Sequence, residues 1–206
     1  MKQIVMLAAG LLLPLGQSNA AEPYFNLQLG SAAGDTDASQ LDSQLAAQGL
    51  NATASSSDDS RTAWRVGVGY PLTSNWAVEL ARVDLGKVTT RFSGTTTDID
   101  TFLTSASDIH PQTAKGWQLS GIYRRPVTEG SWFVARAGLF DWQSDYTLSS
   151  GSVSRKVSAS GLNGSYGIGA EVDVHRYLRL GVNYDRYSVD GEAIAVVSAG
   201  LRFSME

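Results

Sequence analysis

Charged residues stand singly at alternating positions of this 206-residue sequence, among glycine, serine and asparagine. Such spacing places each charge on the polar face of a strand rather than in a catalytic cluster. Charges withdrawn from water are costly unless they are paired, so we expect them to form a network. Its expected members are Arg65, Glu79, Arg136, Glu171, Asp173 and Arg179. A network of this kind either fills an interior with salt bridges, or exchanges partners and gates a path through it.

Catalytic and metal-binding groups are scarce. There is no cysteine, which excludes disulfide scaffolds, Cys-ligated zinc and thiol catalysis. His110 lies close to Asp108 and to several hydroxyl residues, so a hydrolytic triad is conceivable, but Pro111 follows it and no His-x-Ser spacing exists. Asp35 and Asp37 lack the spaced ligands of an EF-hand loop. We therefore expect no metal site, no cofactor and no enzymatic activity.

Residues 1–20 have the organisation of a secretory signal. Lys2 is the only charge in this segment, residues 4–13 form an apolar run, and small residues precede the expected cleavage site. The run is too short for a membrane-spanning helix, which needs about 20 residues. We expect the segment to be removed, so that residues 21–206 form one domain outside the cytoplasm.

Apolar and polar residues alternate with a period of two through most of residues 21–206, a pattern typical of half-buried strands. In residues 64–70, for example, Trp, Val, Val and Tyr alternate with Arg, Gly and Gly. The pattern predicts eight strands, at 23–33, 61–71, 75–88, 114–125, 131–147, 161–174, 178–189 and 192–204.

The predicted connections alternate in length. Three are short turns, while long loops span 34–60, 89–113 and 148–160, and a tight turn at 189–191 lies on the same side as the loops. Short turns opposite long loops are typical of a transmembrane barrel. An even number of strands then places both termini on the periplasmic side and the long loops outside the cell.

The composition of the two faces indicates which one lies inside. Small polar residues suit the narrow interior of an eight-stranded barrel, and aromatic residues near the strand ends of the apolar face are typical of lipid-facing girdles. One expected girdle comprises Trp64, Trp117, Tyr166 and Tyr184, and the other Phe25, Tyr70, Trp76, Tyr123, Phe133 and Phe203. The sequence thus predicts an all-β fold, an eight-stranded antiparallel up-and-down transmembrane β-barrel. The alternative is a soluble, lipocalin-like barrel with an apolar pocket.

Three segments carry a resemblance to a known family. Residues 76–80 (WAVEL) follow a predicted short turn, residues 180–187 read LGVNYDRY, and residues 199–203 (AGLRF) close the last predicted strand. These segments resemble the eight-stranded OmpA-like outer-membrane barrels, which include small adhesin and invasion proteins. The resemblance covers residues 21–206 and implies insertion into the outer membrane. The family usually ends its last strand on an aromatic residue, whereas here three residues follow Phe203.

The predicted turns also fix which inward charges meet. We expect Arg65, Glu79, Arg136 and Glu171 at mid-height, and Arg124, Asp173, Arg179 and Arg202 nearer the short turns. Pairing around the turns predicts Ser120 opposite Arg136, Glu79 diagonal to Arg65, and Asp173 opposite Arg179. Glu79 and Glu171 are then the acids available to Arg65 and Arg136.

The sequence predicts a non-enzymatic outer-membrane protein with a plugged polar lumen, whose loops serve surface binding, adhesion or envelope integrity. Its expected partners are outer-membrane lipid and lipopolysaccharide, with host or envelope proteins at loops 34–60, 89–113 and 148–160. A sequence pI near 5.2 argues against nucleic acid, and we expect a monomer. Two alternatives stay open: an enzyme that modifies lipid A at the barrel rim, and a narrow, porin-like ion channel.

Overall fold

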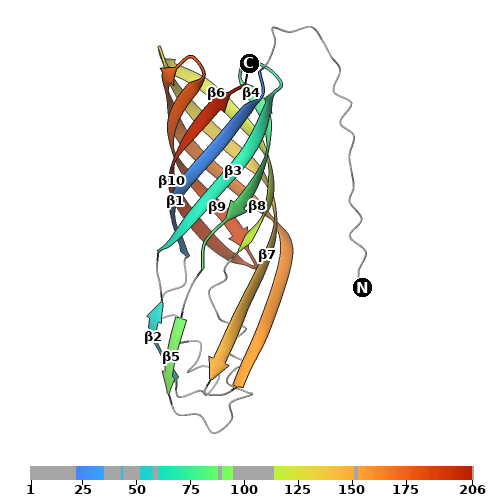
Figure 1. Ribbon diagram of the computed structural model, residues 1–206, viewed down its shortest axis with the longest axis vertical. Helices are drawn as coiled ribbons and strands as arrows, with labels where there is room; N and C mark the ends of the chain where they lie inside the picture. Colours follow the sequence, from blue (N-terminus) through green and yellow to red (C-terminus); the bar gives the residue numbers. More distant parts are fainter. Residues whose placement is uncertain are drawn as a thin grey trace, which may run out of the picture.

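Eight antiparallel strands close into a barrel (Figure 1). The structure is a computed structural model that describes residues 22–34, 43, 52–57, 60–87, 90–94, 114–150 and 153–205. The strands pair in the order β1-β10-β9-β8-β7-β6-β4-β3, and β3 pairs again with β1 to complete the circle. The predicted fold class is confirmed.

The barrel strands agree closely with the expected ones. They are β1 (Tyr24–Gly34), β3 (Arg61–Pro71), β4 (Trp76–Asp84), β6 (Lys115–Thr128), β7 (Ser131–Ser150), β8 (Val153–His175), β9 (Leu178–Val189) and β10 (Glu192–Ser204). Two more strands, β2 (Ala52–Ser57) and β5 (Thr90–Gly94), form a separate two-stranded sheet inside segments predicted as loops. Their sequences, ATASSS and TRFSG, contain too few apolar residues for the alternation to reveal them.

The predicted loop at 148–160 is wrong, because most of it belongs to a hairpin. β7 and β8 stay paired as far as Ser150 and Val153, whereas β9 follows β8 only to Ser165 and β6 follows β7 only to Gln143. Beyond the last pair with β6, residues 144–150 pair only with residues 153–159 and extend past the barrel as a two-stranded β7–β8 ribbon (Figure 1). Residues 160–164 have lost β9 but still pair with the part of β7 that lies beside β6. A ribbon outside lipid needs no apolar face, so its alternation fades while its backbone pairing continues.

The two ends of the barrel differ. At the turn end, uppermost in Figure 1, short turns at 72–75, 129–130 and 176–177 join the strands. At the opposite loop end lie the β2–β5 sheet, the ribbon and the tight hairpin at Asp190 and Gly191 (Figure 1). Both hairpin residues have positive φ, 50° and 86°, as a type I′ turn requires, and glycine adopts that conformation without steric cost. The tight turn predicted at 189–191 is therefore present.

The outer face is apolar. Leu29, Val68, Leu119, Leu139, Ile168, Val182 and Val197 are each more than half exposed. Of the ten expected girdle residues, nine are exposed on this face, and Tyr123 is half-buried there with its ring 5.0 Å from that of Trp76. A contiguous apolar surface of this extent requires an apolar environment. Among the described residues, no helix is long and apolar enough to cross a membrane.

The interior changes character along the barrel axis. Next to the loop end it is filled by a loop-end core of apolar side chains. This core comprises Ala32, Ala63, Ala81, Val83, Leu85, Ala114, Phe140, Trp142, Tyr187, Val189, Ile194 and Val196. The rings of Phe140 and Tyr187 meet edge to face, with centroids 5.2 Å apart. Charged side chains fill the interior toward the turn end.

Candidate functional site

Arg65 and Glu79 form an ion pair at mid-height, and Glu79 is completely buried. Nε of Arg65 also donates to Oε1 of Gln118 over 2.8 Å, and Nδ2 of Asn26 donates to Oε2 of Glu79 over 3.3 Å. Hydrogen bonds with neutral amides, one accepting from Arg65 and one donating to Glu79, support both charges, as a pair withdrawn from water requires.

The register of this pair differs from the predicted diagonal. Glu79 lies opposite Gly69 and Arg65 lies opposite Val83, so the two residues are further apart along the strands than diagonal neighbours. They meet because their long side chains extend along the barrel interior, rather than pointing at each other from paired positions on the two strands.

Arg136 pairs with Asp185, which the expected network did not include. Nη1 of Arg136 lies 2.6 Å from Oδ1 of Asp185, and both side chains are buried. Arg136 on β7 and Asp185 on β9 are both register partners of Gly167, on the strand between them. A Cβ atom at residue 167 would collide with the Asp185 carboxylate. Glycine at this position therefore lets the ion pair cross an intervening strand.

Two expectations about Arg136 are wrong. Its partner on β6 is Ile122, and Ser120 lies opposite Gly138, because the strands run on until the turn holds only residues 129 and 130. A bulge between Pro126 and Thr128 absorbs the extra residue, at a place where proline is tolerated. The second expectation gave Glu79 and Glu171 as the acids available to Arg65 and Arg136, and only Glu79 forms such a pair, with Arg65. Glu171 instead lies near the turn end, opposite Gly181, and Asp185 takes its place.

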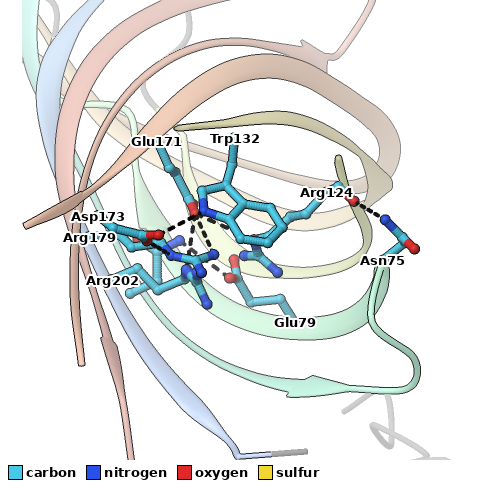
Figure 2. Close-up of polar contacts among 9 residues, drawn as sticks. Asn75, Glu79, Arg124, Trp132, Glu171, Asp173, Arg179 and Arg202 are labelled. Atoms are coloured by element: carbon cyan, nitrogen blue, oxygen red, sulfur yellow. Dashed lines mark hydrogen bonds and ion pairs between the residues drawn. The ribbon is translucent and has the colours of Figure 1, made fainter. Parts of the chain in front are cut away.

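Glu171 is the centre of a turn-end cluster, defined as Arg124, Glu171, Asp173, Arg179 and Arg202 (Figure 2). Its Oε2 atom lies 3.0 Å from Nε of Arg202, 3.6 Å from Nε of Arg124 and 4.0 Å from Nη1 of Arg179. One carboxylate oxygen therefore faces guanidinium groups from three different strands.

Asp173 holds Arg179 from the other side. The two residues are register partners on β8 and β9, as the third turn predicts, and they form an ion pair. Nε1 of Trp132 donates to Oδ2 of Asp173 over 3.1 Å, and the Arg179 guanidinium lies 4.1 Å from the Trp132 ring centre (Figure 2). Cation–π contact and hydrogen bonding together fix the position of this arginine.

A cavity of about 560 Å³ opens beside the turn-end cluster. Its walls include Arg124, Arg179, Arg202 and Trp132, together with residues 71–77 of the β3–β4 turn. By contrast, a cavity beside Arg65 in the mid-height interior measures about 10 Å³, roughly the room that one water needs. The turn end is therefore the roomy part of the interior.

The remaining candidates lie elsewhere. His110, Asp108, Asp35 and Asp37 fall outside the described residues. His175 is exposed at the turn end, with its ring 5.7 Å from that of Tyr177. Within the described ranges, no group of three or more histidine or acidic side chains is placed to hold a metal ion.

Sequence reasoning missed four polar members of the mid-height interior: Asn26, Gln118, Asp185 and Tyr187. Gln118 links Arg65 to Ser165, because its Nε2 donates to Oγ of Ser165 over 2.7 Å. The signal was available, since each of the four occupies an inward position in the alternation of its strand. The predicted network contained only charged residues, so it lacked the three neutral side chains, and it also lacked Asp185.

A closed eight-stranded barrel with an apolar outer face and a polar interior defines the class: a transmembrane β-barrel of the outer-membrane type. The sequence model of the OmpA-like transmembrane domain matches residues 18–196, and the chain belongs to this family. As a member of this family, it is an integral protein of the outer membrane of a Gram-negative envelope.

Several solved structures are similar to this chain at low sequence identity. The N-terminal β-barrel domain of Pseudomonas aeruginosa OprF is 11% identical with a TM-score of 0.50, and the match covers 90% of this chain and 98% of that one. Neisserial surface protein A is 14% identical, covering 88% and 97%, with a TM-score of 0.49. Ail, the attachment invasion locus protein of Yersinia pestis, is 12% identical, covering 89% and 99%, with a TM-score of 0.48. No curated protein sequence matches this chain.

Proposed function

We propose that this protein is a closed barrel, neither an enzyme nor an open channel, that anchors a binding surface at the cell exterior. The loop-end core carries the proposal, because Phe140, Tyr187 and Ile194 are each at most 2% exposed inside the barrel. Apolar side chains packed to this degree exclude water and ions. The buried ion pairs at mid-height support the same interpretation. Charges that are fixed in pairs fill the interior, whereas a gate would need charges that exchange partners.

Single-channel recording in planar bilayers tests the closed lumen. We expect the folded protein to give no sustained conductance steps. A gate built on exchange of the Arg65 partner would instead conduct, and its conductance would change in Glu79→Ala. Steps of that kind would replace this proposal with the channel alternative.

The outward orientation of the loop end is part of the proposal. Short turns favour the periplasmic side because long connections are typical of the extracellular side of such barrels. Protease added to intact cells should cut within 34–60, within 89–113 or in the β7–β8 ribbon. Cleavage confined to 71–75 or 126–130 would reverse the orientation.

The β7–β8 ribbon is the part of the described structure best placed to meet a partner, because it extends past the barrel. Lipopolysaccharide, host protein and envelope protein are the partner classes we propose. Replacing residues 146–157 by a two-residue Asn-Gly turn should leave the barrel folded and reduce attachment of cells to host-cell monolayers. Equal attachment, at equal amounts of folded protein, would argue against binding through the ribbon.

Unchanged lipid A mass spectra with and without the protein would exclude the enzymatic alternative.

A further inference from the structure

The turn-end cavity is lined like a binding site, and neither the closing of the lumen nor binding at the cell surface gives it a role. We propose that it binds a phosphate group, offered either as free phosphate or as the headgroup of a lipid. Three arginines line it, and its volume of about 560 Å³ falls within the roughly 300–1,000 Å³ range of small-ligand pockets.

The charges of the turn-end cluster leave a positive surplus. Arg124, Arg179 and Arg202 face two acids of the cluster, Glu171 and Asp173. Glu79 also interacts with Arg124, but it is already paired with Arg65. Glu22 also lines the cavity, but it is exposed, so water screens its charge. Glu171 divides one oxygen among three guanidinium groups, and only the contact with Arg202 is a hydrogen bond. The cluster can therefore accept a further anion.

Arg124 is the unsatisfied member. It is 7% exposed, its Nη2 atom is buried without a hydrogen-bond partner, and its Nε atom is too far from Glu171, at 3.6 Å, for a good hydrogen bond. Buried charged donors without acceptors are rare in native structures, because leaving them unpaired is costly. An anion in the adjoining cavity would face the part of Arg124 that lines it, and would balance a guanidinium charge that these contacts compensate only weakly.

The position of Arg124 is fixed before any ligand arrives. Its backbone carbonyl accepts from Nδ2 of Asn75 and its amide donates to the Asn75 carbonyl, both over 2.7 Å (Figure 2). Its guanidinium lies 4.6 Å from the ring centre of Tyr24. A guanidinium held in place loses little freedom on binding, which favours recognition of a fixed anion geometry.

Phosphate suits this arrangement better than a carboxylate does. Several guanidinium groups converge from different strands, and a phosphate offers oxygens in more directions than a planar carboxylate. The cavity is also lined by Leu72 and by Trp76, whose side chain lies on the lipid-facing surface. It thus extends from the arginines to the lipid-facing rim, where either free phosphate or a lipid headgroup can reach it.

Calorimetric titration of the folded protein in neutral detergent micelles tests the proposal. One arm uses inorganic phosphate, and the other uses a short-chain phosphatidic acid below its micelle concentration. We expect saturable binding in the millimolar range or tighter in at least one arm. Arg124→Gln should weaken it at least about tenfold, because it removes charge-assisted hydrogen bonds.

Arg125→Gln is the matched control, because the neighbouring arginine is exposed and does not line the cavity. It should leave the dissociation constant unchanged. If Arg124→Gln does not fold, Arg179→Gln serves instead, since that side chain is less deeply buried, at 22% exposed, and also lines the cavity. Binding in the lipid arm alone supports the proposal with lipid as the source. Absence of saturable binding in both arms, or equal weakening in the control, overturns it.

Discussion

The two halves of the barrel interior are built from the same strands and do opposite things. β7 passes through both: Trp132 faces the turn-end cluster, Arg136 lies at mid-height, and Phe140 and Trp142 belong to the loop-end core. Toward the loop end the inward side chains pack against one another and leave almost no space. Toward the turn end they are charged, converge on shared acids and border a cavity.

The difference teaches that strand parity and side-chain chemistry act separately. Parity decides whether a residue faces lipid or the interior, and it holds along β7 from Trp132 to Asp145. Chemistry then decides whether that height of the interior is sealed by dispersion contacts or held by ion pairs.

Phe140→Ala should have the largest effect. Removing a fully buried ring from the loop-end core should lower the free energy of unfolding by about 3–5 kcal/mol, through lost burial and the cavity left behind. Urea unfolding in detergent micelles or lipid vesicles, followed by tryptophan fluorescence, measures it. Leu139→Ala is the control: it changes a half-exposed, lipid-facing neighbour and should cost clearly less. Equal costs would mean that the core does not seal the loop end.

Glu79→Ala should destabilise by about 3 kcal/mol, because it leaves Arg65 buried without its acid. Replacing Arg65 and Glu79 together by alanine should cost less than the sum of the single changes, as for residues that interact directly. The same unfolding measurement applied to both single variants and the double variant gives the interaction energy. A double variant whose cost equals that sum would remove the ion pair as a source of stability.

Val68→Arg tests the parity on which the comparison depends. Val68 is half exposed on the outer face, and a charge near the bilayer midplane should cost about 2–4 kcal/mol. Folding into lipid vesicles, monitored by the difference in gel mobility with and without boiling, reports insertion. Insertion as efficient as that of the unmodified protein would place this face away from lipid.

Gly167→Ala should give the smallest effect, about 1–3 kcal/mol, because the new methyl group collides with the Asp185 carboxylate and forces the ion pair to Arg136 apart. Gly164→Ala on the same strand is the matched control, since a Cβ atom there meets nothing within 4 Å. Chemical unfolding of the two variants side by side separates the collision from the general effect of removing a glycine. Similar costs at both positions would show that the crossing at residue 167 is not strained.

Much of the fold could be predicted from the sequence, because a strand with one face in lipid and one inside must alternate. Eight strands, their order and the tight turn at 189–191 follow from that rule. The β7–β8 ribbon and the β2–β5 sheet do not, because strands outside lipid need no apolar face.

The site was predicted less well, for a reason of register. The height of a residue in the barrel depends on the register of its strand. That register can be predicted only when the first and last residues of each turn are known. The β6–β7 turn is shorter than predicted, so Arg136 lies opposite Ile122 instead of Ser120. Glu171 was likewise expected at mid-height, whereas it joins the turn-end cluster. Pairs joined by one short turn, such as Asp173 and Arg179, could be predicted, and pairs that cross the interior could not.

Closure of the barrel by β1 and β10 sets the order in which the molecule can be assembled. Tyr24 pairs with Ser204. The backbone groups on one edge of β1 therefore have no hydrogen-bond partners until β10 is in place. Hairpins such as β9–β10 can form locally and early, but this seam has the longest loop to close and must form late. A chain that stopped before Glu192 would present two open edges to lipid, where unpaired amides and carbonyls have no partner. The barrel can therefore close in the membrane only after the final strand has been added.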